Sequence, residues 1–140
     1  MKQAFVPLLL ISTILVAQQS ASISLLALIA TPDRYHDKQV TVSGFMYLQR
    51  EHNALYVTKS DFQHALFKNA VYLQVSNELF ERFYALNGCY VEVQGKFDAK
   101  NTGHMGAFSG ELLVKQVVPV STLTVPAHEK DTSVPGSCRS

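Results

Sequence analysis

Alternation of apolar and polar residues along the chain predicts five β-strands. The pattern is clearest at residues 39–49, where Val40 and Met46 would face one side and Phe45 the other. Gly44 falls in the middle of that segment and would allow a bulge or a sharp bend. We expect the remaining strands at residues 54–58, 71–75, 89–97 and 108–120.

Two segments show the helical spacing of apolar residues instead. Residues 22–30 predict a short N-terminal helix that Pro32 would end. The second helix has Asn77 as its expected N-cap, followed by acidic residues in the first turn and an apolar stripe. Asn87 and Gly88 then supply a left-handed stop immediately before the fourth strand.

Three strands, a helix and two further strands form the order of an OB-fold, a five-stranded Greek-key barrel. In that fold the helix lies between strands three and four. A glycine inside a long first strand fits as well, because this strand must curve to serve both sheets of the barrel. An open antiparallel sheet with two helices on one face is the alternative. The sequence favours a mainly β, OB-fold-like barrel preceded by a short N-terminal helix.

The chain begins like an exported protein. Lys2 is followed by an apolar run over residues 5–17, which is shorter than the roughly 20 residues of a spanning helix. A signal peptidase would find small residues at Ala17 or Ala21, and an uncleaved membrane anchor is the alternative. We expect a periplasmic or secreted protein with no stable membrane insertion after cleavage. The expected division is a signal peptide at 1–21, a domain at 22–120 and a flexible tail at 121–140.

Export changes the interpretation of the two cysteines. In an oxidising compartment Cys89 and Cys138 would form an even pair that could tie the C-terminal tail to the domain. Cys89 also shares the parity of the apolar residues in its strand, so simple burial of a free thiol is the alternative.

Composition and charge narrow the classes of partner. The chain has 47% hydrophobic and 16% charged residues, a globular composition. It has 12 basic and 11 acidic residues, and these two numbers become equal once Lys2 is removed with the signal peptide. Proteins that bind nucleic acid through counterion release usually carry a basic excess. Nucleic acid is therefore an unlikely partner for this chain.

Several runs of residues look familiar as a set. The first is a proline, a tyrosine and a lysine that lead into a V-x-V-x-G strand at residues 32–44, after a helix. The others are Asn-Ala-Leu-Tyr at 53–56, Lys-Asn-Ala at 68–70, Asn-Gly-Cys-Tyr-Val at 87–91 and Gly-His-Met-Gly-Ala-Phe-Ser-Gly at 103–110. Over roughly residues 24–120 the chain resembles a family of small exported bacterial OB-fold-like proteins of unassigned function. The resemblance implies the barrel and the export, and it brings no activity.

The strand pattern gathers aromatic residues on the face opposite the main apolar set. In an OB barrel, ligands usually lie on the outer face of strands one to three, with flanking loops over them. Aromatic rings there could stack on sugars, bases or peptide side chains. The alternative is that the N-terminal helix or the 59–68 connection covers these rings as a second small core. The candidate ligand-binding residues are Phe45, Tyr47, Tyr56, Tyr72 and Gln74, with His104 and Met105 from the adjoining loop.

The glycine-rich run at residues 103–110 joins strands four and five, where an OB loop often borders the ligand groove. Its glycines allow positive φ and close approach of the backbone. The run lacks the lysine of a phosphate-binding loop and the spacing of a dinucleotide fingerprint. His104 would either donate to a ligand or hold the loop in place by hydrogen bonds.

The sequence gives little support for a catalytic site or a metal site. No histidine or cysteine spacing typical of a metal site occurs, and only an adventitious surface site is expected. No nucleophile elbow is present, and the carboxylates show no pairing. We therefore expect no cofactor, no dedicated metal site and no identifiable catalytic residue.

Three functions follow from these patterns. The first is a binding or interaction module for a peptide, an envelope protein or a glycan, all favoured over nucleic acid. The second is an envelope hydrolase that uses His104 with Asp61 or Glu51, and it requires a hydrogen bond from His104 to a carboxylate. The third is a structural accessory subunit, which predicts a contiguous exposed aromatic patch without a pocket.

Overall fold

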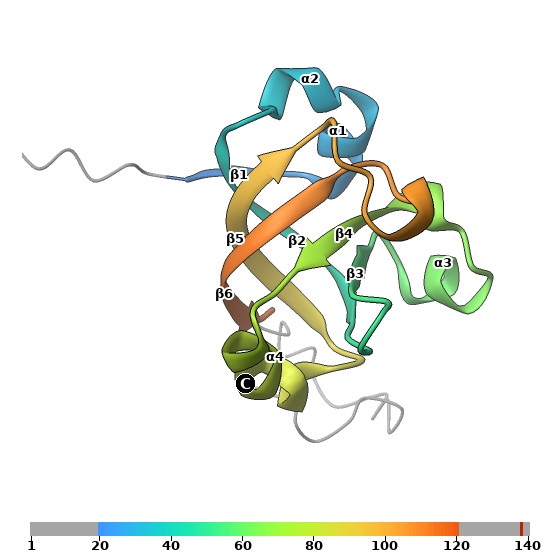
Figure 1. The fold of residues 1–140 in the computed structure, drawn as a ribbon, viewed down its shortest axis with the longest axis vertical. Helices are drawn as coiled ribbons and strands as arrows, with labels where there is room; N and C mark the ends of the chain where they lie inside the picture. The colour runs from blue at the N-terminus through green and yellow to red at the C-terminus, as the bar shows by residue number, and fades with distance from the viewer. Residues whose placement is uncertain (1–19, 121–137, 139–140) are drawn as a thin grey trace, which may run out of the picture.

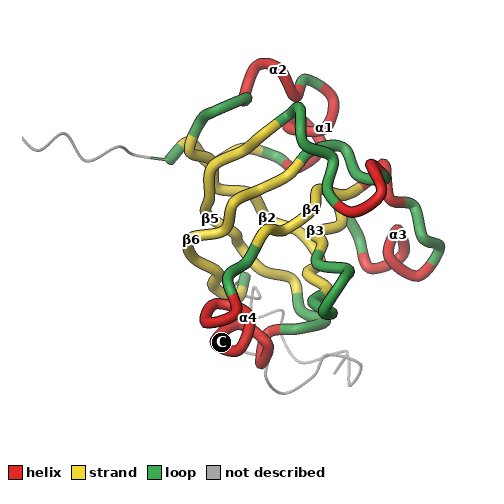
Figure 2. Tube along the Cα trace, viewed as in Figure 1, coloured by secondary structure: helices red, strands yellow, loops and turns green. Residues whose placement is uncertain are grey.

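Five strands close into a barrel. The computed structural model describes residues 20–120 and residue 138, and Figures 1 and 2 show the arrangement of its elements. The strands pair in the order β2–β3–β4–β6–β5, and β5 pairs again with β2 to close the circle. All these pairings are antiparallel except that of β4 with β6. The strands are β2 (Gln39–Tyr47), β3 (Ala54–Tyr56), β4 (Ala70–Gln74), β5 (Tyr90–Asp98) and β6 (Glu111–Pro119).

Helix α4 (Asn77–Phe83) lies between the third and fourth strands of the barrel, β4 and β5. The chain is thus mainly β and forms an OB-fold-like barrel, as the sequence predicts. The expected N-cap was wrong by one residue. The Ser76 hydroxyl accepts a hydrogen bond from the backbone N–H of Leu79 at 3.3 Å, and Asn77 is the first helical residue. A 3-10 turn (Tyr84–Leu86) follows, and Gly88 has the positive φ of 80° that a left-handed stop requires.

The N-terminal part of the domain contains a strand that the sequence analysis missed. Strand β1 (Ala21–Ile23) pairs in parallel with the start of β2. The helix expected at residues 22–30 therefore begins later, as α1 (Leu25–Ala30), with Ser24 as its N-cap. Helix α1 ends at Ala30, as predicted, and Pro32 then begins a second short helix, α2 (Pro32–Tyr35), at whose first position the missing N–H of a proline costs no hydrogen bond.

Ser20 is part of the described fold. Its hydroxyl lies 2.7 Å from the Thr41 hydroxyl on β2 and accepts a hydrogen bond from the Gln94 amide on β5. Ser20 and Ala21 were both assigned to the expected signal peptide. The rest of that segment, residues 1–19, lies outside the described residues, as does the expected tail except for Cys138.

The observed boundaries of all five barrel strands differ from the predicted ones by at most three residues, and two of these differences have a clear cause. The second barrel strand ends at Tyr56 instead of residue 58, because the Thr58 hydroxyl caps helix α3 (Lys59–Gln63). The last strand begins at Glu111 instead of residue 108, because a 3-10 turn (His104–Gly106) and its exit occupy the preceding residues.

Gly44 serves a close approach between strands. A Cβ atom at this position would lie 2.5 Å from the Tyr56 carbonyl oxygen and 2.9 Å from the Leu55 side chain. The pairing of β2 with β5 runs through Gly44 without a shift, and the irregular register falls between Gln94 and Gly95. The glycine thus lets β3 cross β2 closely. It does not form a bulge, which was one of its two expected roles beside a sharp bend.

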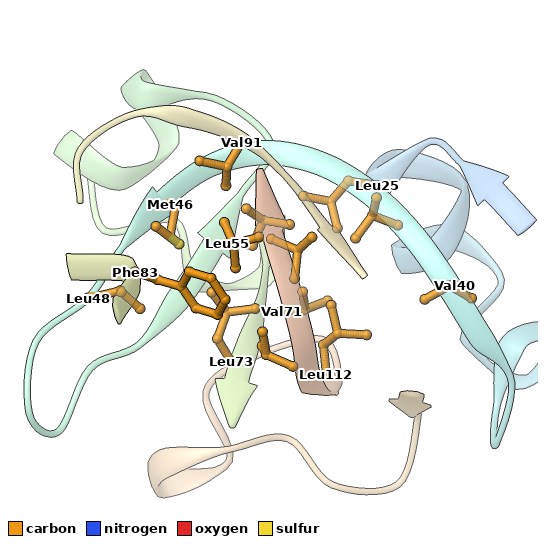
Figure 3. Close-up of a cluster of buried hydrophobic side chains, with 14 of the residues drawn as sticks. Leu25, Val40, Met46, Leu48, Leu55, Val71, Leu73, Phe83, Val91 and Leu112 are labelled. Atoms are coloured by element: carbon orange, nitrogen blue, oxygen red, sulfur yellow. The ribbon is translucent and has the colours of Figure 1, made fainter. Parts of the chain in front are cut away.

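The main core fills the inside of the barrel. Figure 3 shows buried side chains from α1, α4 and the strands meeting there, among them Leu25, Met46 and Leu55, which are at most 3% exposed. Cys89 and Cys138 belong to this core and form a disulfide with a Cα–Cα distance of 5.4 Å. Among the described residues, no helix has the length and apolar character needed to cross a membrane.

Candidate binding groove

The predicted aromatic face is covered by the connection between β3 and β4. Phe62 of α3 packs against three of the rings, with centroids 5.6 Å from Phe45, 4.4 Å from Tyr47 and 5.5 Å from Tyr56. Phe45 is 3% exposed and Tyr56 is fully buried. These rings form a second hydrophobic cluster, which is the alternative arrangement that the sequence left open. Phe45 and Tyr56 therefore present no surface to a ligand in this structure.

The glycine-rich loop is held in place by the Lys68–Ala70 segment. The Ser109 hydroxyl donates to the Lys68 carbonyl oxygen at 2.7 Å, and the Ser109 backbone N–H donates to the Ala70 carbonyl oxygen at 3.0 Å. The Lys68 ammonium group donates to the Phe108 carbonyl oxygen at 3.4 Å. Two of the runs that carry the family resemblance thus meet in space, and their role there is to fix the loop.

The tip of this loop has an unusual backbone. Gly103 and Gly106 have φ of 66° and 67°, and Met105 between them has φ of 56°, a left-handed conformation rare for a side chain of its kind. A Cβ atom on Gly103 would lie 2.4 Å from the Tyr72 ring, so the glycine backbone rests directly on that ring. The tip projects away from the barrel, and Met105 is 89% exposed.

The groove itself lies where β4 ends and α4 begins. Its volume is about 620 Å³. Tyr72 and Gln74 of β4 and Glu81 of α4 all line it, and Figure 1 shows β4 leading into α4. The lining is mostly polar and consists of Arg50, Asn53, Tyr72, Gln74, Val75, Asn77, Phe80 and Glu81.

A second hollow of about 380 Å³ lies beside the glycine-rich loop. Arg50 lines both the groove and this hollow, so its side chain stands at the border between them. The hollow brings together the β2–β3 turn and the loop tip, which are far apart in sequence. Its lining is Gln49, Arg50, Glu51, His52 and His104.

His52 lines the second hollow and also contacts the aromatic cluster. Its Nε2 atom lies 2.7 Å from the buried Tyr56 hydroxyl, and its ring packs against Phe67 and Phe108 at centroid distances of 5.4 Å. Burial lowers the pKa of His52, and the charge of His104 lowers it further. Burial raises the pKa of Tyr56 to about 12. Both groups are therefore neutral at pH 7.

Two carboxyl groups near the depressions, those of Asp61 and Glu111, have structural partners or are buried. Asp61 accepts hydrogen bonds from the Thr58 hydroxyl at 2.6 Å and from the Asn69 amide at 2.8 Å, which fixes the covering segment. Glu111 is 8% exposed beneath the loop, and its pKa is raised by burial and by the Asp98 charge. Within residues 20–120, no hydrogen bond or ion pair joins His104 to a carboxylate, and no cluster of three metal-ligating groups forms.

The structure distributes the predicted ligand-binding residues over three environments. Phe45 and Tyr56 are core residues, and Tyr47 is half-buried under Phe62. Tyr72 and Gln74 line the groove. His104 lines the second hollow, and Met105 stands free at the loop tip beside it.

Sequence analysis missed the residues that the β2–β3 turn and α4 contribute. Arg50 and Asn53 come from this turn, and Glu81 comes from α4. A signal for the first two was present, because in an OB barrel this turn flanks the ligand face and here it is strongly polar. For Glu81 there was none, since the sequence does not specify where α4 packs.

Comparison with known proteins identifies no relative of this chain. No protein-family model matches the chain, and no curated protein matches its sequence significantly.

Proposed function

We propose that this chain is an exported binding module, and that its ligand lies along the groove between β4 and α4 and extends into the second hollow. The observation that carries this proposal is that Arg50 lines both depressions, which lie beside the β2–β3 turn and the glycine-rich loop. These two loops flank the ligand in many OB barrels. Peptides, envelope proteins and glycans are favoured over nucleic acid, since the chain has no basic excess.

The polar lining supports a glycan as the first choice among these ligands. Amide side chains, such as those of Gln74 and Asn77, both donate to and accept from sugar hydroxyls, and a carboxylate such as that of Glu81 accepts from them. An extended peptide often binds by adding a strand to a free sheet edge. Strand β4 offers no such edge, because it is paired with β3 on one side and with β6 on the other.

A periplasmic or secreted location belongs to the same proposal. The Cys89–Cys138 disulfide is compatible with it, since such bonds persist mainly in oxidising compartments. The apolar run at residues 5–17 supports it from the sequence.

Titration of isotope-labelled protein, followed by amide NMR shifts, tests the proposal. The probes are neutral and acidic oligosaccharides, short peptides and oligothymidylate. We expect saturable shifts from a saccharide at Gln74, Asn77 and the loop tip. Gln74→Ala and Asn77→Ala remove groove side chains that are exposed, so the variants should fold and lose affinity. Gln116→Ala, on the exposed face of β6, is the matched control and should bind normally. Saturable shifts confined to other surfaces would refute the groove, and preferential binding of oligothymidylate would refute the ligand class.

A further inference from the structure

The hydrogen bond beneath the second hollow determines which atoms His52 offers to a ligand. Tyr56 is fully buried, and among the described residues its hydroxyl has no partner other than His52 Nε2. A buried O–H group that fails to donate costs free energy, so the hydroxyl donates and Nε2 accepts. The neutral ring then carries its proton on Nδ1. Nδ1, the ring nitrogen of His52 that remains available to a ligand in the hollow, is therefore a donor.

Arg50 adds a second donor at the same place. A guanidinium group has only N–H groups to offer and keeps its charge at any physiological pH. Within the described part of the chain no ion pair involves Arg50, although Glu51 lines the same hollow and Glu81 lines the groove beside it. Exposed ion pairs contribute little to stability, so neither carboxylate would compete strongly with a ligand for Arg50.

The two donors differ from the rest of the groove in their chemistry. Gln74 and Asn77 have amides that donate and accept, which suits hydroxyl groups. Arg50 and His52 Nδ1 only donate, which suits an acceptor with several lone pairs and a negative charge. A ligand that fits both parts has hydroxyl-bearing units along the groove and an anionic group at its end.

We propose that the second hollow is a carboxylate subsite, in which Arg50 and the Nδ1–H of His52 donate to the acid group of a uronic acid, so that the ligand of this module is an acidic oligosaccharide. The inference rests on the proposed function, because it specifies the ligand of the same groove. It assigns His52 and Arg50 a role in specificity, and it leaves Tyr56 as the residue that positions His52 by fixing its tautomer.

The tautomer is tested without any ligand. Long-range proton–nitrogen NMR spectra of the histidine rings distinguish a proton on Nδ1 from one on Nε2. We expect the Nδ1–H form for His52 in the wild type, and a mixture in Tyr56→Phe, which keeps the buried ring and removes only the hydroxyl. A wild-type His52 that carries its proton on Nε2 would overturn the assignment of the donor.

Calorimetric titration with trigalacturonic acid, its methyl ester and hexaglutamate tests the ligand class. The ester keeps the sugar rings and removes the charge. We expect the acid to bind about tenfold more tightly than the ester, the effect of roughly one charge-assisted hydrogen-bonded contact. Arg50→Gln removes one of the two donors, so it should weaken binding of the acid more than binding of the ester and thereby reduce this preference. Arg34→Gln, on the exposed surface of α2 at the other end of the barrel from α4 in Figure 1, should keep the preference.

The outcomes separate the two proposals. Equal affinities for acid and ester, or an equal loss of both in Arg50→Gln, would overturn the carboxylate subsite and leave a glycan-binding groove. Tighter binding of hexaglutamate than of trigalacturonic acid would overturn the saccharide in favour of an acidic peptide. Failure of the acid, the ester and every neutral saccharide to bind would overturn the glycan proposal itself, whatever the tautomer of His52.

Discussion

Loss of the disulfide should remove a large part of the stability of this domain. Cys89 and Cys138 are 49 positions apart, so their bond closes a loop of about 50 residues. The chain-entropy relation gives about 4 kcal/mol for a loop of this length at 25 °C, from the restriction of the unfolded chain. Domains of this size are stable by about 5–15 kcal/mol in total. Reduction should therefore leave the folded state only marginally stable.

Urea unfolding followed by circular dichroism measures this effect with and without reductant. Reduction of the wild type changes only the bond, because both sulfur atoms stay in the chain. With a slope of about 2 kcal/mol per molar urea, the midpoint should fall by roughly 2 M. Cys138→Ala should be destabilised similarly and should no longer respond to reductant. A change of less than about 1 kcal/mol on reduction would refute the reasoning, and it would mean that the unfolded chain is little restricted by the bond.

Three further outcomes are expected. Phe45→Ala should lower the free energy of unfolding by about 3–5 kcal/mol in the same urea assay, because the ring is buried; a loss below 1 kcal/mol would show an exposed ring instead. Burial, and then the Asp98 charge, raise the pKa of Glu111, so the contribution of Glu111 to the stability of the wild type falls as the pH rises above the ordinary pKa of 4.5. Glu111→Gln should therefore gain stability relative to the wild type between pH 4 and pH 7. A difference between the two that stays constant over this range would contradict the raised pKa. Gly103→Ala places a methyl group 2.4 Å from the Tyr72 ring at a positive φ, so the melting temperature should fall and the amide NMR signals of the loop should shift; an unchanged spectrum would contradict the close contact.

The strand order was predictable because each barrel strand has one face toward the core. Val40, Val42 and Met46 alternate with residues of the other face, and this period of two survives in the structure without a slip. The order of the helix and strands then leaves few topologies. Strand β1 could not be found in this way, because three residues with a partly exposed pattern carry too little periodicity to distinguish a strand from the first turn of a helix.

The covering of the aromatic face was foreseen only as an alternative. Residues 59–68 were described as a polar connection, yet Phe62 and Phe67 within them supply the rings that close the second cluster. Two large aromatic residues in a short connection have to be buried somewhere, and the neighbouring aromatic strand face is the nearest apolar surface. Giving weight to these two side chains would have favoured the second core from the sequence alone.

The groove depends on contacts that no local pattern encodes, but its placement follows from the second core. Because Phe62 and Phe67 occupy the middle of the aromatic face, the remaining surface of β4 is its end, where Gln74 leads into α4. The loop fixed by Ser109 then rests on Tyr72 and brings His104 beside the turn that carries Arg50. The buried rings are therefore not the binding surface that their parity suggested. They are the reason why the polar groups of the turn, the loop and the helix are held together at one edge of the barrel.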